Sequence, residues 1–159
     1  MRSEHRPQGL RLARLLVVAV SLLAPGVGTP HSAEQPDFLV LVNADNPVTA
    51  LTTNEISRLF LKKVTTWDDG QLVQPVDQPA ESTARIAFTD VVLRRKPAAV
   101  RSYWQQRIFS GRDVPPPVCG SDAEVVRFVE DNRGAIGYVG SDARPGPGVR
   151  AIAVTGDGS

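Results

Sequence analysis

A chain of 159 residues with a formal net charge of +1 and a single cysteine is the right length for one domain. The near-neutral charge argues against a nucleic-acid-binding protein, in which lysine and arginine dominate one face. One cysteine cannot form an internal disulfide, so the fold must be stabilised by its core.

The first 33 residues have the layout of a secretory signal peptide. Arginines precede an apolar run over residues 15–24, helix-breaking residues follow it, and Ala33 offers a cleavage site before Glu34. The run is about half the roughly 20 residues that a membrane span needs. We therefore expect a periplasmic or secreted protein with no membrane span after cleavage. The alternative is an uncleaved N-terminal anchor.

The composition of residues 34–159 bears on catalysis. Residues 1–33 contain four of the 18 basic residues, one of the 17 acidic ones and both histidines, so 14 basic and 16 acidic residues remain and the net charge falls to −2. Without histidine, hydrolase triads and histidine-based metal sites are excluded from this part. It also contains no glycine-rich nucleotide loop. We expect no enzyme, no catalytic residue, no metal and no cofactor.

In chain order, the first expected element is a strand over residues 38–42. Its continuous apolar sequence, FLVLV, is typical of a strand that is covered on both faces. A helix is expected next, because Thr52 and Glu55 stand three residues apart, as in a capping box. Ile56, Leu59 and Phe60 would then share its buried face.

The middle of the chain predicts a second strand and two helices. The strand covers residues 72–76, and Pro75, which lacks an N–H group, places it near an edge of the sheet. Ser82 or Thr83 can cap a helix that runs to residue 93. Pro97 suits the first turn of the next helix, which carries Trp104.

The last third predicts one more helix and two strands. Ser121 and Glu124 repeat the capping box, and Gly134 can end that helix in the left-handed conformation. Strands are expected over residues 135–139 and 149–154. The alternation of strands and helices predicts an α/β fold with a mixed, mostly parallel sheet and helices on both faces.

Three segments in this order resemble the phosphate-binding branch of the type II periplasmic binding proteins (PBPs). They are residues 42–70 (VNADNPVTALTTNEISRLFLKKVTTWDDG), residues 76–93 (VDQPAESTARIAFTDVVL) and residues 134–139 (GAIGYV). The resemblance implies a single PBP-like lobe over residues 34–159. It also implies a substrate-binding-like protein related to phosphate ABC transporter components. Its ligand would be phosphate or another small oxyanion, and its partner a membrane transporter or sensor.

The chain departs from the family at the turn that cradles phosphate. The family pattern there is arginine, any residue, aspartate, glycine, serine, glycine, threonine. A gapless alignment on Phe88-Thr89 puts Gln78 at the arginine and Ser82 at the serine, and a slip of one residue would bring Thr83 into register. In addition, only one lobe's length is present, and the family's first phosphate loop has no counterpart.

The predicted helix start is the candidate ligand site. A helix N-terminus presents free N–H groups and partial positive charge to an anion, with hydroxyls from Ser82 and Thr83 and charge from Arg85 one turn later. Neutral Gln78 cannot replace the bidentate contact of an arginine, so we expect weak binding that Gln78→Arg would strengthen. The alternative is that Ser82 is an N-cap only. For the whole protein, the alternative is an accessory protein-interaction module that has lost solute binding.

A basic segment follows the candidate site. It comprises Arg94, Arg95, Lys96, Arg101, Arg107 and Arg112. Such a segment can steer anions or dock on an acidic partner. Alternatively, it is the solvated side of two helices.

Overall fold

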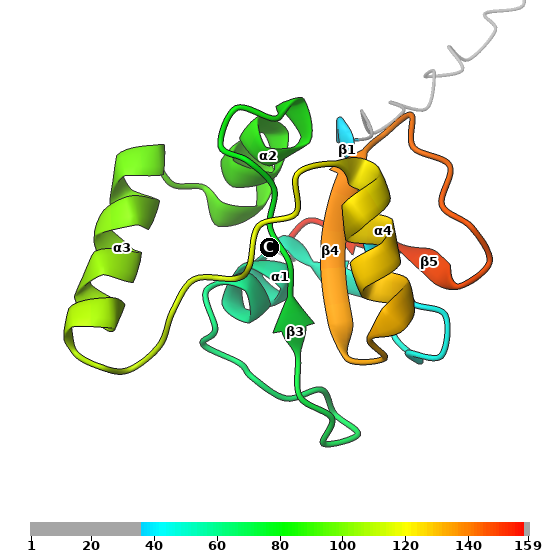
Figure 1. Ribbon diagram of the computed structural model, residues 1–159, viewed down its shortest axis with the longest axis horizontal. Coiled ribbons are helices and arrows are strands. Elements are labelled where there is room, and N and C mark those ends of the chain that lie inside the picture. Colours follow the sequence, from blue (N-terminus) through cyan, green and yellow to red (C-terminus); the bar gives the residue numbers. More distant parts are fainter. Residues whose placement is uncertain (1–35, 158–159) are drawn as a thin grey trace, which may run out of the picture. The chain divides into compact units, whose positions relative to one another are not determined.

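The computed structural model describes residues 36–157, and the predicted signal peptide over residues 1–33 lies outside them. Within the described residues, five strands form one sheet in the order β2-β5-β1-β4-β3. Figure 1 labels β1, β3, β4 and β5. The strands are β1 (Phe38–Asn43), β2 (Ala50–Thr52), β3 (Gln74–Pro75), β4 (Ala135–Gly140) and β5 (Val149–Thr155). The predicted α/β class with a mixed sheet is confirmed.

The long strand pairs of this sheet are antiparallel. Strand β1 is central and pairs antiparallel with β4, where Phe38 is opposite Gly140, and with β5, where Val42 is opposite Arg150. Among the five described strands, the parallel pairs are the short ones at the edges, β2 with β5 and β3 with β4. The expected predominance of parallel pairing is therefore not found. The apolar run of β1 indicates that both faces are covered, which is correct, but it does not determine the direction of the neighbouring strands.

Two strands show what sequence patterns capture and miss. Strand β3 is a two-residue edge strand, as the proline predicts, because Pro75 has no N–H group to donate to a ladder. Strand β2 is not among the predicted elements. It has only three residues, and Leu51 is its sole large apolar side chain, so it has no pattern to detect.

The helices begin where the sequence predicts. They are α1 (Thr53–Phe60), α2 (Thr83–Phe88), its continuation as the π-helix η1 (Thr89–Leu93), α3 (Pro97–Phe109) and α4 (Asp122–Asp131). At α1 the capping box is complete, since the Glu55 N–H donates to Thr52 Oγ1 at 3.2 Å and the Thr52 N–H donates to Glu55 Oε2 at 2.7 Å. Among the described residues, no helix is both long and apolar enough to cross a membrane.

The second capping box is only half formed. Ser121 Oγ accepts the Glu124 N–H at 3.3 Å, but the Glu124 carboxylate accepts from the N–H of Gly120 instead of that of Ser121. The expected left-handed stop at Gly134 is wrong, because α4 ends at Asn132 in extended conformation. Gly134 is needed for a different reason. A Cβ at this position would lie 2.1 Å from the carbonyl oxygen of Leu72.

Helices cover both faces of the sheet, as predicted. On one face, Phe38, Val40 and Val42 pack with α1, α2, η1 and α3. On the other face, Leu41 and Val139 pack with α4, which lies beside β4 in Figure 1. The β3–α2 turn begins at the edge of the sheet, because β3 is the edge strand and pairs with β4.

Aromatic rings connect α2 to the sheet. The Phe88 ring stacks on that of Tyr138, with centroids 4.0 Å apart and an interplanar angle of 7°. Phe60 of α1 packs on both rings, with centroids 4.6 Å from Phe88 and 5.7 Å from Tyr138. This cluster packs the end of α2 against β4.

Candidate functional site

The four predicted ligand-binding residues lie on and just after the turn that joins β3 to α2. The turn is held at its start by neighbouring segments. The Val76 N–H donates to the Ile136 carbonyl at 2.9 Å, and the Asp77 N–H donates to the Pro117 carbonyl at 2.8 Å. The Cys119 N–H returns a bond to the Asp77 carbonyl at 2.9 Å. The position of this turn is therefore set by β4 on one side and by residues 117–119 on the other.

Gln78 points into the protein. Its side chain is buried, and its Nε2 donates to Asp122 Oδ1 and to the Tyr138 carbonyl oxygen, both at 2.8 Å. The other carboxylate oxygen of Asp122 accepts the Gly140 N–H at 3.1 Å. Gln78 thus ties the turn to the start of α4 and to the end of β4.

Arg85 is paired within the protein. Its guanidinium forms a salt bridge with the Asp77 carboxylate, and its Nε donates to Thr89 Oγ1 at 3.2 Å. The same carboxylate accepts the hydroxyl hydrogen of Tyr138 and the N–H of Gln78, the latter at 2.9 Å. Asp77 therefore neutralises the positive charge that the sequence assigned to an anion site.

Tyr138 is the buried member of this group. Its hydroxyl lies between Asp77 and the Gln78 N–H, which approaches to 3.3 Å. Burial raises the pKa of Tyr138 to about 12, although the nearby Arg85 and the hydrogen bond from Gln78 act in the opposite direction. Tyr138 is thus a neutral hydrogen-bond donor at physiological pH.

Ser82 and Thr83 lie at the start of α2, as predicted. Ser82 is the N-cap, and its Oγ accepts the Arg85 N–H at 3.0 Å. Thr83 is exposed. Among the described residues, the backbone N–H groups of Thr83 and Ala84 have no hydrogen-bond acceptor. Two N–H groups at the positive end of the helix dipole therefore lack an acceptor; of the two residues, Thr83 is exposed and Ala84 is buried.

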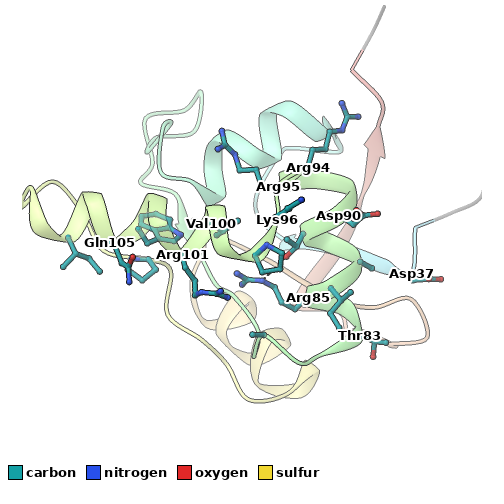
Figure 2. Close-up of a pocket in the computed structure, with 18 residues that line it drawn as sticks. Asp37, Thr83, Arg85, Asp90, Arg94, Arg95, Lys96, Val100, Arg101 and Gln105 are labelled. Carbon is teal, nitrogen blue, oxygen red and sulfur yellow. Dashed lines mark hydrogen bonds between the residues drawn. The ribbon is translucent and has the colours of Figure 1, made fainter.

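Thr83 and Arg85 also line a groove of about 930 Å³ between α2, η1 and α3, whereas Gln78 and Ser82 do not (Figure 2). The structure thus brings Ser82, Thr83 and Arg85 together at the helix start and turns the Gln78 side chain away from them. No cluster of three or more potential metal ligands occurs among residues 36–157.

The sequence matches one protein family over almost all of the described residues. Residues 36–155 match the PBP superfamily domain. The chain belongs to the PBP superfamily. This confirms the expected single PBP-like lobe, and it agrees with the resemblance of residues 42–70, 76–93 and 134–139. A comparison with curated proteins gives no match.

Solved structures of the superfamily share the fold. A putative phosphate ABC transporter substrate-binding protein with bound phosphate from Clostridium perfringens aligns with a TM-score of 0.59 and 21% identity, over 75% of this chain and 45% of that one. An ABC-type phosphate transport receptor from Vibrio cholerae aligns with a TM-score of 0.59 and 22% identity, over 78% and 49%. PstS from Borrelia burgdorferi aligns with a TM-score of 0.60 and 13% identity, over the same shares. The chain spans about half the length of these binding proteins.

Sequence reasoning missed three residues of the site, namely Asp77, Asp122 and Tyr138. Asp122 could have been noticed, since an acidic residue in the first turn of a helix with a predicted cap is well placed to accept hydrogen bonds. Tyr138 lies in a strand that alternates between two buried faces, so its hydroxyl needs a buried partner. Such a requirement predicts that a partner exists but does not identify Asp77.

Proposed function

We propose that this member of the PBP superfamily is a non-catalytic binding protein that holds a small oxyanion, such as phosphate, weakly at the start of α2. The observation that carries the proposal is the pair of N–H groups of Thr83 and Ala84 that lack an acceptor among the described residues. The hydroxyl of Thr83 lies beside them, and helix N-termini with free N–H groups favour anions. The bound phosphate in the Clostridium perfringens protein supports this ligand class.

The contacts around this helix start predict that the affinity is low. Arg85 is already paired with Asp77, and Gln78 is already bonded to Asp122 and Tyr138, so neither is available as a cationic clamp. A charge-assisted hydrogen bond contributes roughly 1.5–3 kcal/mol, which corresponds to about a tenfold to hundredfold loss of affinity when it is missing. A single lobe also leaves the ion hydrated on one side, which weakens each remaining contact. We expect a dissociation constant in the high micromolar range or weaker.

Calorimetric titration of the protein lacking residues 1–33 with phosphate and sulfate tests this proposal. Changing Ser82 and Thr83 together to alanine should weaken the measured binding, because it removes the Thr83 hydroxyl and the Ser82 cap that holds the helix start in place. The matched control is Ser121→Ala, which removes the same type of N-cap from α4 and should leave anion binding intact. Submicromolar binding by the parent protein would contradict the proposal, and unchanged binding by the double variant would place the site elsewhere.

We also propose that residues 1–33 are a signal peptide and that the protein acts outside the cytoplasm with a membrane transporter or sensor. The arginine-flanked apolar run over residues 15–24 supports export. Intact-mass measurement of periplasmic or culture-supernatant material should find a protein that begins at or within a few residues of Glu34. A full-length chain confined to the cytosol would contradict export.

A second candidate function, an accessory interaction module that has lost solute binding, is favoured by the Asp77–Arg85 salt bridge. In this case the Asp77 carboxylate stays paired with the Arg85 guanidinium, the cation that an oxyanion would need. The same calorimetry separates the two functions, because a folded protein that gives no heat with any oxyanion supports the module.

A further inference from the structure

The groove beside α2 has two apolar walls with helical spacing. Pro97, Val100, Trp104 and Ile108 lie along one side of α3 and line it. The opposite wall includes Ile86 and Ala87 of α2. Ile86 is 58% exposed and Ile108 is 49% exposed, so apolar surface remains open to solvent along this groove.

This pattern is unusual for a surface that contacts only water. Scattered apolar residues are normal on protein surfaces, but a contiguous trough between two helices is typical of a binding site. The α3 wall extends from Pro97 to Ile108, which at a rise of 1.5 Å per residue is about three helical turns. A trough of this length and shape matches the face of another helix, with apolar residues three and four positions apart.

The charges around the groove are unevenly paired. Arg94 is bound to Asp157 at 3.1 Å, and Arg85 is bound to Asp77. Among the described residues, Arg95, Lys96 and Arg101 form no salt bridge, although all three line the groove. Figure 2 shows Arg95 and Lys96 at the turn between η1 and α3, with Arg101 farther along α3.

Two acidic residues, Asp37 and Asp90, also line the groove. They are fewer than the three unpaired cations, so the local charge is positive. Of the rest of the basic segment, Arg107 lies 4.0 Å from Asp113, and Arg112 does not line the groove. Of the two interpretations of this segment, docking on an acidic partner therefore concerns Arg95, Lys96 and Arg101 specifically.

We infer that the groove between α2, η1 and α3 binds an acidic amphipathic helix of a partner protein. The apolar stripe of that helix packs between Ile86 and Ile108, and its glutamates or aspartates pair with Lys96 and Arg101. Thr83, whose N–H group is proposed to hold an oxyanion, also lines this groove. The inferred contacts with a partner helix are made by other residues, namely Ile86, Lys96, Arg101 and Ile108, so the inference goes beyond that function. Charge complementarity selects the partner and accelerates association, while burial of the apolar stripe supplies most of the affinity.

Fluorescence anisotropy with two designed peptides tests this inference. One is a capped helical peptide of about four turns with a leucine stripe flanked by glutamates, and the other carries lysines in place of the glutamates. We expect the acidic peptide to bind with micromolar affinity and the basic one at least about tenfold more weakly, because like charges at a groove rim repel. Added salt should weaken binding of the acidic peptide, since the Lys96 and Arg101 side chains are solvent-exposed and their charges are screened.

Variants of the exposed residues locate the binding surface without disturbing the core. The Ile86→Ser variant should bind the acidic peptide about tenfold more weakly, or weaker still. The double variant Lys96→Glu with Arg101→Glu should lose affinity for this peptide by about the same factor. The matched controls are Leu72→Ser, at an apolar side chain 65% exposed outside the groove, and Arg112→Glu, at an exposed cation outside it. Both controls should bind the peptide like the parent protein.

Several outcomes would overturn the inference. They are the absence of acidic-peptide binding, equal binding of the acidic and basic peptides, and loss of binding in the control variants. A concentration-dependent dimer that Ile86→Ser dissociates would assign the groove to a second copy of this chain. Binding to phosphatidylglycerol vesicles that the charge-reversed pair abolishes, without peptide binding, would assign it to a membrane surface.

Discussion

Asp77 and Arg85 form a salt bridge across the first turn of α2, and the bridge joins the end of β3 to the helix start. The carboxylate takes the position that a bound anion would need in order to use the Arg85 guanidinium. The protein therefore carries its own counter-ion at the site where the resemblance implies a ligand.

Asp77→Asn should strengthen phosphate binding. The asparagine leaves Arg85 without a charged partner, and an unpaired guanidinium next to Thr83 can bond an oxyanion, which is worth about a tenfold gain in affinity. Calorimetry against the parent protein checks this prediction. Asp113→Asn is the matched control, because Asp113 accepts from Lys62 at 3.0 Å and does not line the groove. Equal affinities of parent and Asp77→Asn would show that Arg85 does not reach the ligand.

Gln78→Arg is expected to leave phosphate affinity within about twofold of the parent value, contrary to the expectation from the family pattern. In the structure, the side chain at this position lies beside the Asp122 carboxylate, 2.8 Å from Nε2. A guanidinium placed there would pair with Asp122 before it could bind a ligand. Adding Asp122→Asn to this variant tests the reason, since only the double variant should gain affinity. A strong gain in Gln78→Arg alone would contradict the assigned side-chain direction.

Gly134→Ala should destabilise the protein by about 1–3 kcal/mol or more, as overpacked sites do. A Cβ at this position would lie 2.1 Å from the Leu72 carbonyl oxygen, so the backbone of one segment must move. Gly146→Ala is the control, because a methyl group added to Gly146 would have no neighbouring atom within 4 Å. Denaturant titration gives the free energy of unfolding for both variants. Equal values would show that the backbone around Leu72 can move away from the added methyl group at little cost in stability.

Tyr138 should ionise only near pH 12 in the folded protein. Since its folded pKa is raised from the ordinary value of 10.0, stability from this group is complete below pH 10 and is lost as pH rises toward 12. The loss is on the order of 2 kcal/mol. Ultraviolet absorbance of tyrosinate measures the ionisation, and denaturant titration at each pH measures the free energy of unfolding. Tyr138→Phe should remove this pH dependence of stability. A normal titration near pH 10 in folded protein would contradict burial of the hydroxyl.

Local signals in the sequence predict more of this fold than long-range ones. Thr52 and Glu55 are neighbours in sequence, so their reciprocal bonds follow from residue type and spacing alone. The N-cap role of Ser82 is predictable for the same reason. The antiparallel partners of β1 lie far along the chain, and no pattern within residues 38–42 specifies their direction.

The candidate site shows the same division. Its position at the start of α2 could be predicted, because a capped helix start is a local feature. The Asp77–Arg85 salt bridge and the bond from Gln78 to Asp122 could not, because each depends on how the β3–α2 turn packs against β4 and α4. Tertiary packing therefore decides whether a predicted ligand residue is available to a ligand.

The central position of β1 has a consequence for how the chain is made. Both neighbours of β1 in the sheet, β4 and β5, follow all the described helices in chain order. Until β4 and β5 emerge from the ribosome, the apolar strand β1 has no hydrogen-bond partner on either side. Pairings between such distant segments close slowly. The central sheet therefore cannot form before β4 and β5 have been synthesised, and the proposed export through a translocation channel would require such an unfolded chain.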